Sequence, residues 1–129
     1  MKQNRLFKWI AVAALGVMLS ALAAPATQAL TVNAFVVRQS CVNGDVVAVT
    51  LSATVQPNVQ VKYRWDFTNN GTLDTTASTN PTVTHRYPDE RRITARVVAI
   101  MANGTRASDT VTFTTRRCGG GGGGGGADD

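Results

Sequence analysis

The feature that most constrains this chain is an alternation of apolar and polar side chains along runs rich in β-branched residues. From Leu30 onward the sequence holds 16 Thr and 14 Val in 100 residues, and no stretch keeps an apolar period of 3.6 residues. β-Branched side chains lose little freedom in strands and crowd helices. A period of two places every second side chain on the same face of a strand. The sequence therefore predicts an all-β domain of half-buried strands.

Four runs carry this alternation most clearly. The inward-facing positions are predicted to be Val47, Val49, Leu51, Ala53 and Val55, then Val59, Val61, Tyr63, Trp65 and Phe67, then Ile93, Ala95, Val97 and Ala99, and finally Val111 and Phe113. About seven short strands in fewer than 90 residues are typical of a β-sandwich.

Turn signals separate these runs. Asn-Gly occurs at Asn43-Gly44, Asn70-Gly71 and Asn103-Gly104. This dipeptide readily supplies the two positive φ angles of a tight hairpin turn. The third copy lies between alternating runs at 93–101 and 106–115, so a hairpin is predicted there.

The N-terminus has the three parts of a secretory signal peptide. Lys2, Arg5 and Lys8 form a basic start, an apolar run covers 10–24, and small residues follow. Residues 1–29 are therefore predicted to be an export signal. Candidate cleavage positions follow Ala23, Ala26 and Ala29.

Export predicts that the protein is secreted or periplasmic. The alternative is a membrane anchor, but the apolar run is shorter than the roughly 20 residues that a spanning helix needs. Cleavage after Ala29 leaves ten basic and eight acidic residues, an excess of about +2. We therefore expect no nucleic-acid partner, and no stable membrane insertion after cleavage.

The two cysteines, Cys41 and Cys118, favour a structural disulfide. An exported chain with an even number of cysteines is expected to oxidise them. Closing this span would remove about 4–5 kcal/mol of denatured-state entropy in the chain-entropy model. The alternatives are a redox pair or metal ligands, although the sequence has no Cys-x-x-Cys and has a single His.

The C-terminus is dominated by glycine. Eight glycines, 119–126, precede Ala127-Asp128-Asp129. Such a stretch cannot form a core and behaves as a flexible chain. The predicted organisation is therefore a signal peptide at 1–29, a folded domain at 30–118 and a disordered tail at 119–129, which serves either as a linker or as a plain tail.

Several motifs lie in and between the strand runs. They are Tyr63-Arg64-Trp65-Asp66-Phe67, Asn70-Gly71, Asn80-Pro81, His85-Arg86-Tyr87, the alternating run 93–99 and Asn103-Gly104. Together they resemble the PKD domain, an immunoglobulin-like β-sandwich module of secreted and cell-surface proteins. The resemblance spans about residues 32 to 115.

The resemblance implies structural roles for five signature residues, Trp65, Asp66, Phe67, His85 and Tyr87. The indole should anchor the core, the Tyr87 hydroxyl should bond nearby backbone as in a tyrosine corner, and His85 should be a hydrogen-bonded brace. In this fold the first strand runs parallel to the last. Strands at 32–37 and 107–115 would then end near Cys41 and Cys118, at the same end of the domain.

Catalysis is not expected. An enzyme needs a poised nucleophile, acid or base with an orienting partner. After signal cleavage the chain offers only His85 and Glu90 besides its aspartates and cysteines, and His85 lies within the structural motif. No cofactor is expected, with one candidate exception.

That exception is a weak calcium loop. Oxygen-bearing residues follow calcium-loop spacing, with Gly71 at the position of the sharp turn. The candidate ligands are Asp66, Thr68, Asn70, Thr72 and Asp74. Ala77 stands where a bidentate Glu would be, so a polar turn in which Asp66 and Asn70 bond backbone amides is the favoured interpretation.

Sheet alternation also predicts a basic patch. If Tyr63, Trp65 and Phe67 point inward, then Lys62 and Arg64 point outward. The full candidate binding patch comprises Lys62, Arg64 and Arg96 on the strands, Thr112 and Thr114 beyond them, and Arg86, Arg91 and Arg92 at the edge. Its alternative role is a solvated surface that discourages aggregation.

The sequence thus predicts a secreted, non-catalytic binding or adhesion module for a protein or for an anionic or neutral glycan, at the cell envelope or outside the cell. The alternatives are a spacer or stabilising accessory domain for a partner protein, and a calcium-dependent adhesion domain.

Overall fold

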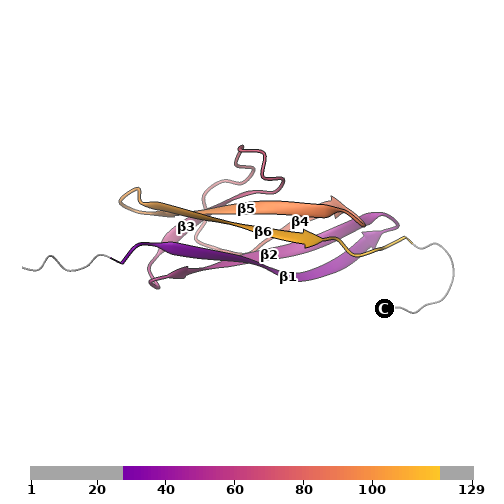
Figure 1. The fold of residues 1–129 in the computed structure, drawn as a ribbon, viewed down its shortest axis with the longest axis horizontal. Helices are drawn as coiled ribbons and strands as arrows, with labels where there is room; N and C mark the ends of the chain where they lie inside the picture. Colours follow the sequence, from indigo (N-terminus) through magenta and orange to yellow (C-terminus); the bar gives the residue numbers. More distant parts are fainter. Residues whose placement is uncertain (1–27, 120–129) are drawn as a thin grey trace, which may run out of the picture.

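The computed structural model describes residues 28–119, which form two antiparallel β-sheets packed face to face (Figure 1). The predicted signal peptide and the glycine tail lie outside these residues, apart from 28–29 and Gly119. No helix in the described part is long and apolar enough to cross a membrane. The strands are β1 (Thr31–Asn43), β2 (Val46–Gln56), β3 (Val61–Asp66), β4 (Val83–Pro88), β5 (Arg92–Met101) and β6 (Arg106–Thr114).

One sheet has the order β1-β2-β4 and the other β3-β5-β6. The predicted β-sandwich is therefore confirmed, with six strands in the described residues. The expected seventh is reduced to a single bridge, in which Ser78 and Tyr63 exchange backbone hydrogen bonds of 2.7 and 3.1 Å. Asp74 also donates its N–H to the Trp65 carbonyl at 2.7 Å. The connection between β3 and β4 thus lies along the edge of β3 without forming a strand.

The predicted hairpin joins β5 and β6, but its turn differs from the expected one. Gly104 has a φ of 89°, whereas Asn103 does not have a positive φ. The Gly104 N–H donates to the Met101 carbonyl at 2.9 Å, and the Asn103 side chain accepts the Thr105 N–H at 2.9 Å. The Met101 N–H also donates to the Thr105 carbonyl at 2.8 Å, so the loop at 102–104 has three residues and one positive φ, as in a turn followed by a glycine bulge. The prediction from Asn103-Gly104 was correct for the hairpin and wrong for its turn type.

The core lies between the sheets and follows the predicted alternation. Trp65 is 1% exposed, and Leu51, Val47 and Val49 are fully buried. The other buried apolar members are Ala34, Ala53, Val55, Val61, Tyr63, Phe67, Tyr87, Ala95, Val97 and Ala99. The indole Nε1 of Trp65 has no hydrogen-bond partner among the described residues.

β1 and β6 lie side by side and run in the same direction (Figure 1). Side chains join them. The Ala34 N–H donates to Asp109 at 2.8 Å, and the Gln39 amide donates to the Thr114 carbonyl at 3.1 Å and accepts the Arg116 N–H at 2.8 Å. The resemblance implied parallel strands, and their link is made by carboxylate and amide side chains rather than by a backbone ladder.

Cys41 and Cys118 form a disulfide at the end of this strand pair, as predicted, with their Cα atoms 5.5 Å apart. Cys41 lies inside β1, because this strand runs on to Asn43 rather than ending at residue 37.

The segment that carries Cys118 is held by two further contacts. The Cys118 N–H donates to the Asp89 carboxylate at 3.0 Å. A Cβ atom at Gly119 would clash with the Gly44 carbonyl, so the chain passes close to the β1–β2 turn. The disulfide therefore closes one end of the sandwich.

Candidate functional site

The outer face of the β3-β5-β6 sheet gathers cationic side chains. In the register of β3 and β5, Lys62 lies opposite Ile100, Arg64 opposite Val98, and Asp66 opposite Arg96. Residues that lie opposite each other in an antiparallel pair share a face of the sheet. Lys62, Arg64 and Arg96 therefore point to the same side.

Two more arginines belong to this face. On β6, Arg106 lies opposite Ile100 of β5. On β5, Arg92 lies opposite Thr114 of β6. Arg106 was not among the predicted patch residues, although it continues the outward alternation of Thr112 and Thr114 back to the start of the strand. We call the set Lys62, Arg64, Arg92, Arg96 and Arg106 the basic face.

Two of the predicted patch residues lie elsewhere. Arg86 is exposed on β4, where it lies opposite Ala48 of β2. It therefore projects from the outer face of the other sheet, and its expected place at the edge of the basic face is wrong. Two facts decide this: β4 belongs to the β1-β2-β4 sheet, and Arg86 points outward because its neighbour Tyr87 points into the core. Arg91 is exposed in the turn between β4 and β5, beside the basic face rather than on it.

Carboxylates do not neutralise the basic face within residues 28–119. The one ion pair there joins Arg117 Nε to Glu90 Oε2 at 4.0 Å. Arg64 donates its Nε–H to the Thr75 carbonyl at 2.8 Å, which fixes the side chain and leaves its charge unpaired. Asp66, the carboxylate opposite Arg96, is fully buried and accepts backbone amides.

A hollow of about 280 Å³ lies between two arginines of the basic face. Val98, which is 4% exposed, lines it although it is on an outward position. The β3–β4 connection supplies the facing wall, and Figure 1 shows this connection projecting from the sheets near β5. We call this the arginine hollow; its lining residues are Gly71, Leu73, Arg96, Val98, Arg106, Ala107 and Ser108.

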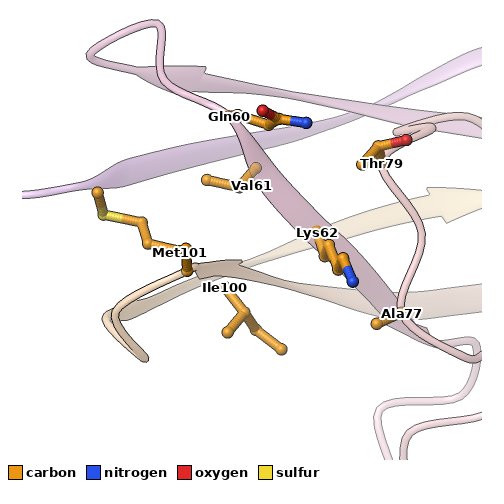
Figure 2. Close-up of a pocket in the computed structure, with 8 residues that line it drawn as sticks. Gln60, Val61, Lys62, Ala77, Thr79, Ile100 and Met101 are labelled. Atoms are coloured by element: carbon orange, nitrogen blue, oxygen red, sulfur yellow. The ribbon is translucent and has the colours of Figure 1, made fainter.

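A second hollow, of about 480 Å³, lies where β3 begins and β5 ends (Figure 2). Figure 2 shows Lys62 and Ile100 on one side of the sheet and Val61 and Met101 on the other. Apolar residues outnumber polar ones among the residues that line it, so the lining is mainly apolar. We call this the apolar hollow; it is lined by Gln60, Val61, Lys62, Ala77, Thr79, Ile100, Met101 and Ala102.

The five candidate calcium ligands lie at the end of β3 and on the loop that follows, but the carboxylate oxygens of Asp66 already accept backbone amides. Asp66 Oδ1 accepts the amides of Thr68 and Asn70 at 3.3 and 3.1 Å, and Oδ2 accepts that of Gly71 at 2.8 Å.

Two further side chains of the loop are used in the same way. Asn70 Oδ1 accepts the Thr72 amide at 2.9 Å, and Asp74 Oδ2 accepts the Phe67 amide at 2.8 Å. Among residues 28–119, no three His, Cys, Asp or Glu side chains form a group that could hold a metal ion. The loop geometry agrees with the polar-turn interpretation.

The signature aromatic residues form a stack that joins the sheets. His85 lies parallel to Phe67 with ring centres 4.0 Å apart, and meets Tyr87 edge-on at 4.7 Å. The Tyr87 hydroxyl donates to the Phe67 carbonyl at 2.8 Å, across the sandwich rather than within a local corner. None of the hydrogen bonds in the described part of the chain involves the His85 ring. His85 therefore braces the fold by stacking, where hydrogen bonding was expected.

Burial shifts the ionisation of both rings. Partial burial lowers the pKa of His85, and the negative charge of Asp74 opposes this shift. Burial raises the pKa of Tyr87 far above its ordinary value, and Asp74 and Asp66 add to the shift. Both rings are therefore held in their neutral forms near pH 7.

Comparison with known proteins assigns this chain to a family. No curated protein and no solved structure matches the chain. The family model of the PKD domain matches residues 29–115, well over half of the chain. This range contains all six strands and the aromatic stack. The chain therefore belongs to the PKD domain family, whose members are non-catalytic immunoglobulin-like modules of extracellular and cell-surface proteins.

Proposed function

We propose that this protein is an exported, non-catalytic binding module that holds an anionic partner against the basic face. The observation that carries the proposal is the set of five cations that share this face without a carboxylate partner in residues 28–119. Five of the ten Lys and Arg residues in that range lie there. Such a concentration exceeds what solubility requires of a surface of mixed charge.

The chemistry of the face suits anions. Guanidinium groups bind carboxylate, sulfate and phosphate through paired N–H donors, and their charge does not titrate near pH 7. Exposed hydroxyls on β6 stand beside them and can donate or accept further hydrogen bonds. These are Ser108, Thr110, Thr112 and Thr114, which share the outward alternation of Arg106.

Export is part of the proposal. The signal-like N-terminus favours it, and the Cys41–Cys118 disulfide suits an oxidising compartment such as the periplasm or the exterior of the cell. N-terminal sequencing of the protein from culture supernatant and periplasm should start after Ala23, Ala26 or Ala29. An intact Met1 in a membrane fraction would contradict export.

The binding proposal is tested by retention on immobilised polyanions. The native protein should be retained on both poly-L-glutamate and polygalacturonate at low salt and elute as salt rises, because screening weakens the attraction. Arg64→Glu with Arg96→Glu should abolish retention. Arg86→Glu, which reverses a charge on the opposite sheet, is the matched control and should retain most of it.

Two alternatives predict other results. A spacer or stabilising accessory domain would show no retention that depends on Arg64 and Arg96. A calcium-dependent adhesion domain would bind its partner with calcium and release it with chelator, through the loop at Asp66 rather than through the basic face.

A further inference from the structure

The two hollows adjoin each other along β5. Val98 lines the arginine hollow and Ile100 lines the apolar hollow, and these are successive outward positions of the same strand. Arg106, which lines the arginine hollow, lies directly opposite Ile100. A partner that covers one hollow therefore reaches the other.

The spacing suits an extended polypeptide. Successive outward positions of a strand are about 6.8 Å apart, and an extended peptide advances by nearly the same length over two residues. Arg96 is four residues from Ile100, or about 13 Å along β5. Side chains two to four residues apart in a bound extended segment would therefore reach the centres of the two hollows.

We propose that the partner is an extended polypeptide segment that places a carboxylate side chain in the arginine hollow and a large apolar side chain, two to four residues away, in the apolar hollow. This inference rests on the proposed function, because it identifies the anionic partner of the same face.

The apolar hollow distinguishes a polypeptide from an acidic polysaccharide. Its lining is mainly apolar, with Ile100 as the large aliphatic side chain on the outer face and Ala77 on the facing connection, and it is larger than the arginine hollow. Sugar rings carry hydroxyls that would lose water against the apolar members of this lining, which offer them no hydrogen bonds. An aliphatic or aromatic side chain loses no hydrogen bond there.

Lys62 lies at the rim of the apolar hollow, where Figure 2 shows its side chain on the same side as Ile100. Its ammonium group can pair with a second acidic group of the segment. The expected recognition pattern is therefore an apolar residue flanked by acidic ones.

The test is an NMR titration of the ¹⁵N-labelled protein with short synthetic peptides. The probes are blocked Gly/Ser peptides that contain one Leu and one Glu, spaced by two or by four residues. In the control peptides Glu is replaced by Gln, or Leu by Ser. The complete probes should shift the amides of Arg96, Val98 and Ile100, and each replacement should weaken binding roughly tenfold.

Protein variants locate each contact. Arg96→Gln with Arg106→Gln should remove the preference for Glu over Gln, and Ile100→Ser should remove the preference for Leu over Ser. Arg86→Gln, on the opposite sheet, should change neither. If Ile100→Ser does not fold, the Leu-to-Ser replacement in the peptide tests the same contact with the native protein.

The outcomes separate this inference from the proposed function. If oligogalacturonate binds through Arg96 and the peptides do not bind, the partner is a polysaccharide, and the inference is overturned while the proposed function stands. Peptide binding that is insensitive to the Leu replacement overturns the inference as well. If neither probe binds, both proposals fail.

Discussion

The acidic and basic side chains of the described domain occupy different regions and have different partners. Four of the six Asp and Glu residues between 28 and 119 accept backbone amides: Asp66, Asp74, Asp89 and Asp109. They fix the β3–β4 connection, the C-terminal segment and the junction of β1 with β6. The cations of the basic face instead point outward from a regular sheet.

This difference separates the side chains that hold the fold from those that we propose to meet a partner. Carboxylates accept hydrogen bonds from N–H groups that the strands leave unpaired at loops and edges. Arginines that point outward from a sheet are not needed for this purpose, because the hydrogen bonds between strands already pair the backbone groups around them. Substitutions in the first region should change stability. Substitutions in the second should change binding alone, except at Arg64, which also bonds the Thr75 carbonyl.

The largest effect on stability should come from the disulfide. Replacing both Cys41 and Cys118 with Ser should lower the free energy of unfolding by about 4 kcal/mol, because the bond closes most of the domain into one loop. Urea denaturation of the oxidised protein and of the variant measures this difference. A reducing agent should destabilise the native protein and leave the variant unchanged.

Removing the carboxylate of Asp66 should have the next largest effect. Asp66→Ala leaves three backbone amides without their acceptor and should cost about 2–4 kcal/mol. Asp66→Asn keeps one acceptor oxygen and should cost less. If Asp66→Ala unfolded at the same urea concentration as the native protein, this carboxylate would not hold the fold.

The pH dependence of stability should report on His85, the single histidine of the chain. Its pKa is lowered in the folded state, so the unfolded state binds more protons below its ordinary value of about 6.5. Stability should therefore fall as the pH drops below about 7 and level off below the folded pKa. The loss should stay under about 1 kcal/mol, because the ring is only half-buried.

His85→Phe is the control for this effect. It keeps an aromatic ring against Phe67 and removes the titrating group, so its stability between pH 7 and 5 should fall less than that of the native protein. Equal slopes in urea denaturation across this range would contradict the assignment.

Arg96→Gln and Arg106→Gln should change stability by less than about 0.5 kcal/mol, as exposed substitutions usually do. Urea denaturation under the conditions of the binding assay measures this change. A loss comparable to that of Asp66→Ala would show that the basic face serves the fold.

Calcium should have the smallest effect. We expect millimolar calcium to leave the Tm unchanged, because Asp66 and Asp74 already accept backbone amides. Thermal denaturation with calcium and with chelator tests this. A higher Tm with calcium, lost in Asp66→Asn, would instead support the calcium-dependent adhesion alternative.

Sequence reasoning was most successful where a local rule acts alone. Alternation placed Trp65 and Leu51 in the core, because side-chain direction in a strand has a period of two. It was less successful where the outcome depends on how strands pair. The turn at Asn103 has one positive φ rather than two, because the hydrogen bond between Met101 and Thr105 closes a three-residue loop. Arg86 was misplaced because the sequence does not say which sheet a strand joins.

The sequence by itself determined the all-β class, the faces of the strands, the paired cysteines and the outward direction of Lys62, Arg64 and Arg96. These properties depend on backbone periodicity and residue chemistry. The tertiary structure alone decided that Arg106 joins Arg96 around one hollow, that Ile100 and Met101 line another, and that Asp66 bonds three amides of its own loop. Such groupings depend on strand order and register, which arise only when the sheets pair and pack.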